Sequence, residues 1–414
     1  MKIVMPEKPT LADFPHLVTH TQVPEDPYER PAGDPPKEPF EALGAEAVKL
    51  GWENRGIRRS RFPMVPPDYR NETLQRFREK YSFLDAIRGV EDEWERILLL
   101  RNWVHRTLPN GTEAPYLDQP SFFQRPYPDE GFDPFRVLDM AGTGCRWWCP
   151  HYSQMLRAVL SACGYLSRHV GNISFYSPKE GARTHGVTDC FVQKFGKWVQ
   201  LDAHYDCHYA KDGVPLAPYE IGEEWHRNSG KNLTVHAGPE GRTADHALNA
   251  FEGEHESCRA FWNQHRWYMD PFSNHGTWFA TWDAQLVLVL TGQRHEGILA
   301  YRGQNPGSEA DRGYSDGRIQ YTRRAADVYP DVGTSHLALE KGPHAGTLRV
   351  KVGTFTPNLA ALEVRVDEQP WSVQGADFLW YPHHGENTLR VRTRNQFGLL
   401  GRESSVQAVL KKKG

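Results

Sequence analysis

Cysteine is scarce in this chain, long apolar runs are missing, and neither sign of charge is in excess. Six cysteines in 414 residues are too few for a disulfide scaffold. The longest apolar run is the short "AQLVLVLTG" from Ala284, far below the roughly 20 residues that span a bilayer. The 49 basic and 52 acidic residues nearly balance, which argues against the basic surface of a nucleic-acid-binding protein. We therefore expect a globular protein with no membrane insertion and no nucleic-acid partner.

The first residues and the few cysteines also bear on location. The start "MKIVMPEKPTLADFP" has one early lysine and an apolar segment that Pro6 and Glu7 interrupt, unlike a secretory signal. A chain without a disulfide framework fits a reducing compartment. We expect a cytoplasmic protein, with secretion as the alternative if a signal peptide was removed.

Composition divides the chain into four parts. Residues 1–67 hold twelve prolines and few periodic apolar runs, which predicts a proline-rich arm over 1–70 without a core of its own. Helical patterns begin a larger domain over 71–275, and 276–335 reads as a connecting β-rich region. In 336–414, runs such as "TLRVKV" and "ALEVRV" alternate apolar and polar positions. They predict a C-terminal all-β sandwich with an immunoglobulin or fibronectin type III pattern.

The stretch "CRWWCPHYSQMLRAVLSACGYLSRHV" from Cys145 contains the strongest candidate for a reactive thiol. Its apolar residues share one helical face with Cys163, which we expect in the core. Pro150 suits the first position of that helix, which makes Cys149 the N-cap. Free backbone N–H groups and the helix dipole stabilise a thiolate at such a position.

A cysteine nucleophile needs a base, and the base needs an acceptor that orients it. Two strand-like runs, "HGVTDCFV" from His185 and "KWVQLDAHY" from Lys197, predict a hairpin. A turn at 192–195 would set His185 opposite Asp202. We predict that His185 takes the proton of Cys149 and that Asp202 fixes the imidazole tautomer.

These residues resemble the transglutaminase-like superfamily, a papain-related α+β fold with an antiparallel sheet and helices. The matching elements run from about Leu74 to Tyr209: "RNWVHRT", Cys149 with Ser153, "GYLSR" ending at Arg168, and "HGVTDCFVQKFGKWVQLD". The resemblance implies that Cys149 is the nucleophile, His185 the general base and acid, and Asp202 the orienting residue. Cys145 lies four residues too early for this pattern.

Some positions depart from the pattern of the superfamily. Trp147 stands where a glycine is frequent, Val187 where an aromatic residue is frequent, and Ala203 where a proline is frequent. Because of these departures, we expect a substrate cleft that differs from the best-known pattern of the superfamily. The oxyanion donor is left open among the Cys149 backbone N–H and the indole N–H groups of Trp148, Trp147 and Trp103.

Two other clusters of residues suggest possible binding sites. His204, Cys207 and His208 are metal-ligand types, but the chain lacks a paired CxxC or an HExxH, so we expect a loop beside Asp202 and no metal or other cofactor. The aromatic residues over 261–282 are expected to form a packing seam between domains. A sugar-stacking surface is the alternative.

The resemblance implies a cysteine-dependent enzyme that cleaves an amide through an acyl-enzyme. Hydrolysis is favoured over cross-linking, because bacterial-type chains of this kind look like proteases or amidases and no acidic calcium loop is evident. The substrate would be a protein, a peptide or isopeptide, or a glycopeptide, as for the peptide N-glycanases of the same superfamily. The alternative is a carbohydrate- or protein-binding protein whose transglutaminase-like domain is catalytically silent.

Overall fold

A computed structural model describes residues 38–60, 66–108, 133–141, 147–173, 184–243, 264–269, 286–290 and 319–412, apart from 42, 44, 55, 67, 148, 229, 241 and 323. These residues form two compact units. One takes 66–192 and 198–328 and mixes helices with sheets, and the other takes 38–60, 193–197 and 329–412 and is almost entirely β. The predicted α+β class is therefore confirmed, with an all-β region at the C-terminal side.

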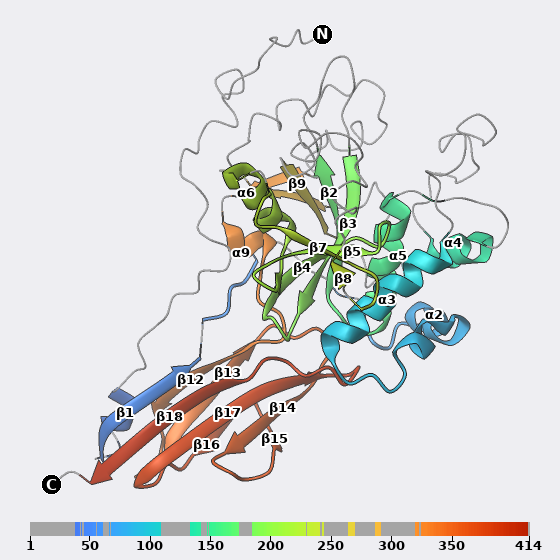
Figure 1. Cartoon of the computed structure of the whole chain (residues 1–414). Coiled ribbons are helices and arrows are strands. Elements are labelled where there is room, and N and C mark those ends of the chain that lie inside the picture. The colour runs from blue at the N-terminus through green and yellow to red at the C-terminus, as the bar shows by residue number, and fades with distance from the viewer. Residues whose placement is uncertain are drawn as a thin grey trace, which may run out of the picture. The chain divides into compact units, whose positions relative to one another are not determined.

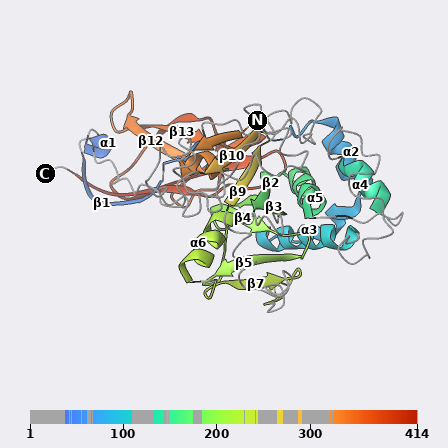
Figure 2. The same ribbon diagram turned by 90° about the horizontal axis from the view of Figure 1, so that it is seen from above.

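The first unit contains most of the helices (Figure 1). Its longest helix, α3, begins at Glu93 because the Asp92 side chain accepts a hydrogen bond from the Glu95 backbone N–H at 2.9 Å. Helices α3 and α5 pack side by side next to the main sheet (Figure 2). The helices are α2 (Glu72–Lys80), the 3-10 helix η2 (Ser82–Ile87), α3 (Glu93–Thr107), α4 (Pro134–Ala141), α5 (Cys149–Ala162), α6 (Pro218–Asn228) and α9 (Ala325–Val328).

The main sheet of this unit has six strands in the order β11-β10-β9-β2-β3-β4. Strands β9, β2 and β3 are antiparallel neighbours, whereas β10 and β11 are parallel. The turn between β3 and β4 covers 193–196, one residue later than predicted, and Gly196 has the left-handed φ of +62° there. The bounds are β2 Ser167–Ile173, β3 Thr184–Val192, β4 Lys197–Leu201, β9 Gln264–Met269, β10 Leu286–Leu290 and β11 Ile319–Thr322.

Helix α5 packs on the central strands β2 and β3, and most of the residues that it buries are apolar. Burying a Leu or Val side chain stabilises a fold by about 1.5–3 kcal/mol, so this contact fixes the helix firmly on the sheet. Cys163 lies in this core, as predicted, and is 5% exposed. The buried residues of α5 are Tyr152, Ser153, Gln154, Met155, Leu156, Ala158, Val159, Leu160, Ser161 and Ala162.

A smaller sheet follows the main one along the chain, with the strand order β6-β5-β7-β8. Its own apolar cluster includes Tyr209, Leu216 and Ile221. Strand β5 begins directly after the turn at 203–206, so this sheet anchors the far end of that turn. The bounds are β5 Cys207–Lys211, β6 Val214–Pro215, β7 Thr234–Ala237 and β8 Arg242–Thr243.

The second unit consists of two antiparallel sheets that share one apolar core. The sheets have the orders β1-β18-β17-β14-β15 and β12-β13-β16, and Trp380 of β16 meets Phe40 edge-on at 6.1 Å between ring centroids. The bounds are α1 Glu38–Glu41, β1 Ala45–Glu53, β12 Ser335–Lys341, β13 Leu348–Thr354, β14 Leu359–Val366, β15 Ser372–Gln374, β16 Asp377–Trp380, β17 Gly385–Asn395 and β18 Ser404–Lys412. Thus α1 and β1, from the segment predicted as an arm, belong to this unit.

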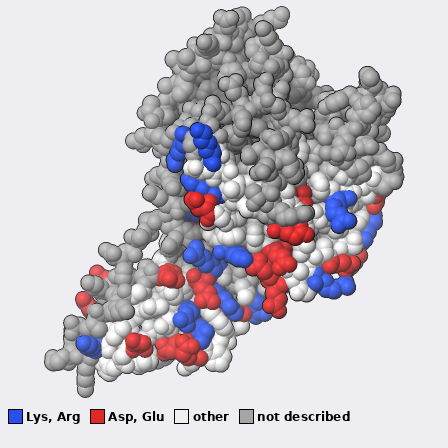
Figure 3. Space-filling view, in the orientation of Figure 1, with Lys and Arg blue, Asp and Glu red and all other residues white. Residues whose placement is uncertain are grey.

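Charges of both signs are interspersed over the described residues on the face drawn in Figure 3, with no broad field of one sign. Exposed ion pairs among the described residues include Lys351 with Glu340 at 2.7 Å. No helix in the described part of the chain combines the length and the apolarity that a bilayer crossing requires.

Candidate active site

Cys149 is the first residue of α5, one position inside the helix that was predicted to begin after it. Pro150 follows as a residue that needs no N–H partner, so the helix starts without a lost hydrogen bond. Cys149 is half-buried, whereas the other described cysteines, Cys163, Cys190 and Cys207, are buried free thiols. Among the described thiols, Cys149 is therefore the one that a solute can reach.

His185 lies near the start of β3, and Asp202 directly follows β4. The His185 Nε2 atom and the Asp202 Oδ2 atom are 2.6 Å apart, and both side chains are buried. The Cys149 side chain hydrogen-bonds to His185 as well. Cys149, His185 and Asp202, which lie far apart in the sequence, thus form one hydrogen-bonded series in the structure.

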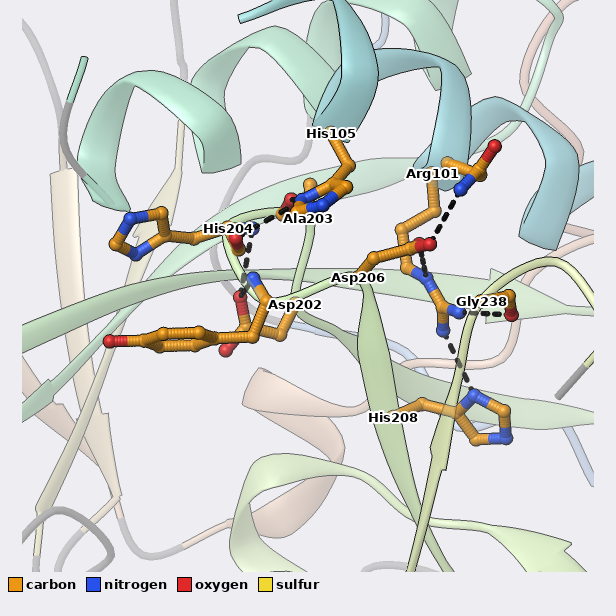
Figure 4. Close-up of polar contacts among 10 residues, drawn as sticks. Arg101, His105, Asp202, Ala203, His204, Asp206, His208 and Gly238 are labelled. Carbon is orange, nitrogen blue, oxygen red and sulfur yellow. Dashed lines mark hydrogen bonds and ion pairs between the residues drawn. The ribbon is translucent and has the colours of Figure 1, made fainter. Parts of the chain in front are cut away.

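Asp202 is held by the turn that follows it. Its Oδ1 atom accepts the backbone N–H groups of His204 at 3.0 Å and of Tyr205 at 3.1 Å (Figure 4). Its backbone exchanges two hydrogen bonds with Cys207, each 2.9 Å long. Because one carboxylate oxygen is engaged by the turn and the other by His185, Asp202 has no freedom to rotate away.

The environment makes the His185–Asp202 pair ionic. Burial alone lowers the pKa of His185, but the negative charge of Asp202 and the contacts with Asp202 and Cys149 outweigh it and raise this pKa to about 10. Burial alone raises the pKa of Asp202, but the charge and hydrogen bond of His185 outweigh it and hold this pKa below its ordinary value. A histidine beside the cysteine, oriented by a carboxylate, is the arrangement that a nucleophilic cysteine mechanism requires.

Aromatic rings surround this imidazole. The Tyr205 ring lies 5.4 Å from the His185 ring and 4.6 Å from the His204 ring, centroid to centroid. The Tyr152 ring of α5 lies 4.8 Å from the His204 ring. Burial, followed by the positive charge of His185, lowers the pKa of His204 to about 4, so His204 is a neutral neighbour of the charged pair.

Gly186 allows α5 to come close to β3. A Cβ atom at this position would lie 2.7 Å from Cε1 of His169 and 3.1 Å from Cα of Pro150. The His169 ring cannot easily yield, because its Nδ1 atom is 2.7 Å from the Ser153 hydroxyl. A residue without a side chain next to His185 therefore sets how near Cys149 approaches the base.

Acid is expected to destabilise the protein through His169. Burial, followed by the charges of Arg157 and His185, lowers the pKa of His169 from 6.5 to about 3. Between these values the unfolded chain binds a proton that the folded chain does not, so the free energy of unfolding falls as the pH drops from 6.5 towards 3. Urea unfolding of wild type and His169→Gln at pH 7 and pH 4.5 checks this. An equal loss in both proteins would contradict it.

Two of the candidate oxyanion donors, Trp103 and Trp147, lie within the described residues. Trp103 is half-buried, its ring lies 5.7 Å from the Phe83 ring, and its carbonyl accepts a hydrogen bond from the Thr107 hydroxyl. Trp147 is buried with its ring 4.9 Å from that of His151. Trp148 and Cys145 lie outside the described residues, as does most of the aromatic stretch over 261–282.

The residues considered as metal ligands have other roles in the fold. His208 Nδ1 is 2.9 Å from Nη1 of Arg101, and Cys207 belongs to the apolar cluster of the small sheet. Within the described ranges, no three His, Cys, Asp or Glu side chains group closely enough to hold a metal ion.

The polar partners of the turn after Asp202 were not predicted from the sequence. Arg101 is fully buried on α3 and binds Asp206 in that turn. The available signal was a charged residue within the otherwise apolar buried stripe of α3, four residues before His105. The hydrogen bond between Ser153 and His169 was also not predicted, although both residues lie in the segment that resembles the transglutaminase-like superfamily.

Comparison with known proteins adds little to this geometry. No family model matches the chain, and no curated protein matches it. Among solved structures, one from Cytophaga hutchinsonii described as a "Putative Cysteine Protease" is 12% identical, and the match covers 42% of this chain and 44% of that one with a TM-score of 0.23. The chain thus spans less than half the length of that protein. Because so low a TM-score carries no argument, any inference about function depends on the arrangement of Cys149, His185 and Asp202.

Proposed function

We propose that this protein is a transglutaminase-like cysteine hydrolase that cleaves amide bonds through an acyl-enzyme on Cys149. The observation that carries the proposal is the hydrogen-bonded series from Cys149 through His185 to Asp202. The position of the thiol at the start of α5 adds support, because a helix N-terminus favours a thiolate. A papain-related core for the first unit, and an immunoglobulin-like sandwich for the two C-terminal sheets, are parts of the same proposal.

The chemistry follows from the charges of the three groups. The Cys149 thiolate attacks the carbonyl carbon, and the tetrahedral intermediate collapses as His185 donates its proton to the leaving amine. The acyl-enzyme is then attacked by water, whose proton returns to His185, and the carboxylic acid leaves as the thiolate is restored. Asp202 keeps the imidazole oriented and stabilises its charged form throughout.

The substrate class is a peptide, isopeptide or glycopeptide amide. Water as the acyl acceptor gives hydrolysis, and a primary amine gives cross-linking. Hydrolysis is the preferred outcome on the resemblance of the sequence. A cytoplasmic location belongs to this proposal, and the free thiols of the described cysteines support it.

Selective labelling of Cys149 by iodoacetamide tests the proposal first. At neutral pH we expect Cys149 to react well before Cys163, Cys190 and Cys207, because these three are buried and burial raises the pKa of each. Peptide mapping by mass spectrometry identifies the labelled residue. Tests of turnover then use glutamine peptides, isopeptides and glycopeptides, with and without a primary amine, on native protein and on protein blocked at Cys149.

The outcomes of this experiment distinguish the enzyme proposal from the binding-protein alternative. An acyl adduct or product that blocking abolishes supports acyl transfer through Cys149, and incorporation of the amine indicates cross-linking in place of hydrolysis. If all thiols are inert and no panel member is bound covalently or cleaved, the enzyme proposal fails. The carbohydrate- or protein-binding alternative would then take its place.

A further inference from the structure

Three polar residues of one face of α3 contact the turn that follows Asp202. They are Arg101, Asn102 and His105, and we call them the α3 clamp. Figure 4 shows Arg101 and His105 reaching from the helix to opposite ends of this turn. The turn covers 203–206, between Asp202 and the first residue of β5.

Arg101 uses its whole guanidinium group. Nε donates to Asp206 Oδ1 at 2.8 Å, Nη1 lies 2.9 Å from His208 Nδ1, and Nη2 donates to the Gly238 carbonyl at 2.9 Å. Burial, followed by the charges of Arg101 and His236, lowers the pKa of His208 well below its ordinary value, so His208 is a neutral acceptor for this guanidinium. The fully buried Arg101 therefore has a fixed position and direction.

Asp206 is bound from several sides at the end of the turn. Its second carboxylate oxygen accepts Asn102 Nδ2 at 2.6 Å, and its carbonyl accepts the Gly238 N–H at 2.9 Å. Its φ of +49° is in the left-handed region, which costs an L-residue free energy unless the surroundings enforce it. The α3 clamp supplies that enforcement at the side chain.

His105 holds the beginning of the turn. Its Nδ1 atom lies 3.1 Å from the Ala203 carbonyl and 3.2 Å from the His204 carbonyl. Because both partners are acceptors, Nδ1 carries the proton and donates to them. The carbonyls of Ala203 and His204 thus face α3, while the N–H groups of His204 and Tyr205 face the carboxylate of Asp202.

We infer that the α3 clamp is a positioning device for the acid of the triad, acting on Asp202 through the turn at 203–206. Arg101, Asn102 and His105 are positioning residues and contact none of the reacting atoms. The inference rests on the proposed function and assigns the orientation of Asp202, and through it that of His185, to α3. A side chain that must be placed to within about 0.5 Å needs such second-layer support.

A purely structural role makes a different prediction. A buried ion pair that only stabilised the fold would alter the free energy of unfolding when changed, but it would leave the charge state of His185 intact in the molecules that remain folded. A positioning role links the clamp to the pKa of His185, because this pKa is raised by contact with Asp202. The titration of His185 is therefore the deciding measurement.

The test uses full-length His105→Phe, which removes the donor to the turn, and His105→Gln, which keeps one. Asp206→Asn provides a second route to the same effect if His105→Phe folds poorly. Leu100→Ala is the matched control, because Leu100 is a buried neighbour on α3 with no polar contact to the turn. His185 is titrated by NMR on protein labelled with ¹⁵N-histidine, and the rate of Cys149 alkylation by iodoacetamide is measured at pH 6 and pH 9.5.

We expect His105→Phe and Asp206→Asn to lower the pKa of His185 by at least about one unit, which is a tenfold change in its protonation equilibrium. Because a pKa lowered from about 10 to about 9 leaves His185 protonated at pH 6, alkylation there should change by less than about twofold, and the variants should differ from the wild type between pH 9 and pH 10. His105→Gln should recover most of the wild-type values. Leu100→Ala should lower Tm and leave both profiles unchanged.

An unchanged His185 titration in His105→Phe and Asp206→Asn would overturn the inference, whatever happens to Tm. Failure of the proposed function gives another pattern: wild-type Cys149 reacts slowly at pH 6 and no substrate is turned over. Because the His185 titration needs neither thiol reactivity nor a substrate, it decides the clamp in that case too.

Discussion

The Cys149→Ala variant is expected to form no covalent adduct and to lower turnover of any accepted substrate by at least about 10⁴-fold, the scale of removing a triad nucleophile. The effect is large because the attacking atom itself is lost, while the His185–Asp202 pair at 2.6 Å remains. Intact-mass spectrometry and initial rates on the substrate panel measure it. The variant should keep the Tm of the wild type within a few degrees, since Cys149 is half-buried and carries little packing.

Cys163→Ala is the matched control for this prediction. Cys163 is on the same segment of chain but is 5% exposed, and burial raises its pKa to about 12, so it is a protonated core thiol. Its replacement should reduce stability by creating a small cavity and leave turnover intact. Turnover that persists in Cys149→Ala, or that disappears in Cys163→Ala at temperatures where the protein is folded, would refute the assignment of the nucleophile.

Gly186→Val is expected to reduce Cys149 reactivity and turnover by at least about 100-fold, because misplacing reacting groups by about 1 Å has effects of this size. A Cβ atom alone would lie 3.1 Å from the Cα atom of Pro150, which is backbone and has no rotamer to change. The start of α5 must then move away from β3, and Cys149 moves with it. Iodoacetamide alkylation at neutral pH measures the loss without needing a substrate.

Gly56→Val is the comparison for this substitution. Nothing lies within 4 Å of a Cβ atom at Gly56, and its backbone is not in the left-handed region. It should therefore leave alkylation and turnover at wild-type values. If Gly186→Val behaved like Gly56→Val, the close approach of α5 to β3 would have no part in setting the reactivity of Cys149.

The three triad residues could be chosen from the sequence because each is marked by local chemistry. Cys149 precedes a proline and an amphipathic run, and His185 and Asp202 flank two β-rich runs with a turn between them. The structure sets His185 and Asp202 side by side although the turn lies one residue later than predicted. Hydrogen bonds from the turn after Asp202 hold its carboxylate, and a hairpin prediction from turn length alone does not include them.

The α3 clamp could not be found in the same way. Arg101 is more than one hundred residues from Asp206 in the sequence. Without knowledge of this partner, a single arginine in an apolar stripe is interpreted as a residue at the edge of the buried face. The oxyanion candidates were similarly beyond sequence reasoning. Tryptophan is favoured in cores and clefts alike, and the burial and neighbours of Trp103 and Trp147 are set by the fold.

The pairing of β1 with β18 has a consequence for synthesis of the chain. Ala45–Glu53 leaves the ribosome roughly 350 residues before its partner Ser404–Lys412, a delay of roughly 20–70 s at ordinary elongation rates. Throughout this interval the edge of β1 lacks the strand that will bind it, while residues 66–192 and 198–328 of the α+β unit are made in between. The five-stranded sheet can therefore close only after Ser404–Lys412 has been translated, and a ribosome stalled before Ser404 would hold a nascent chain with an open strand for chaperones to cover.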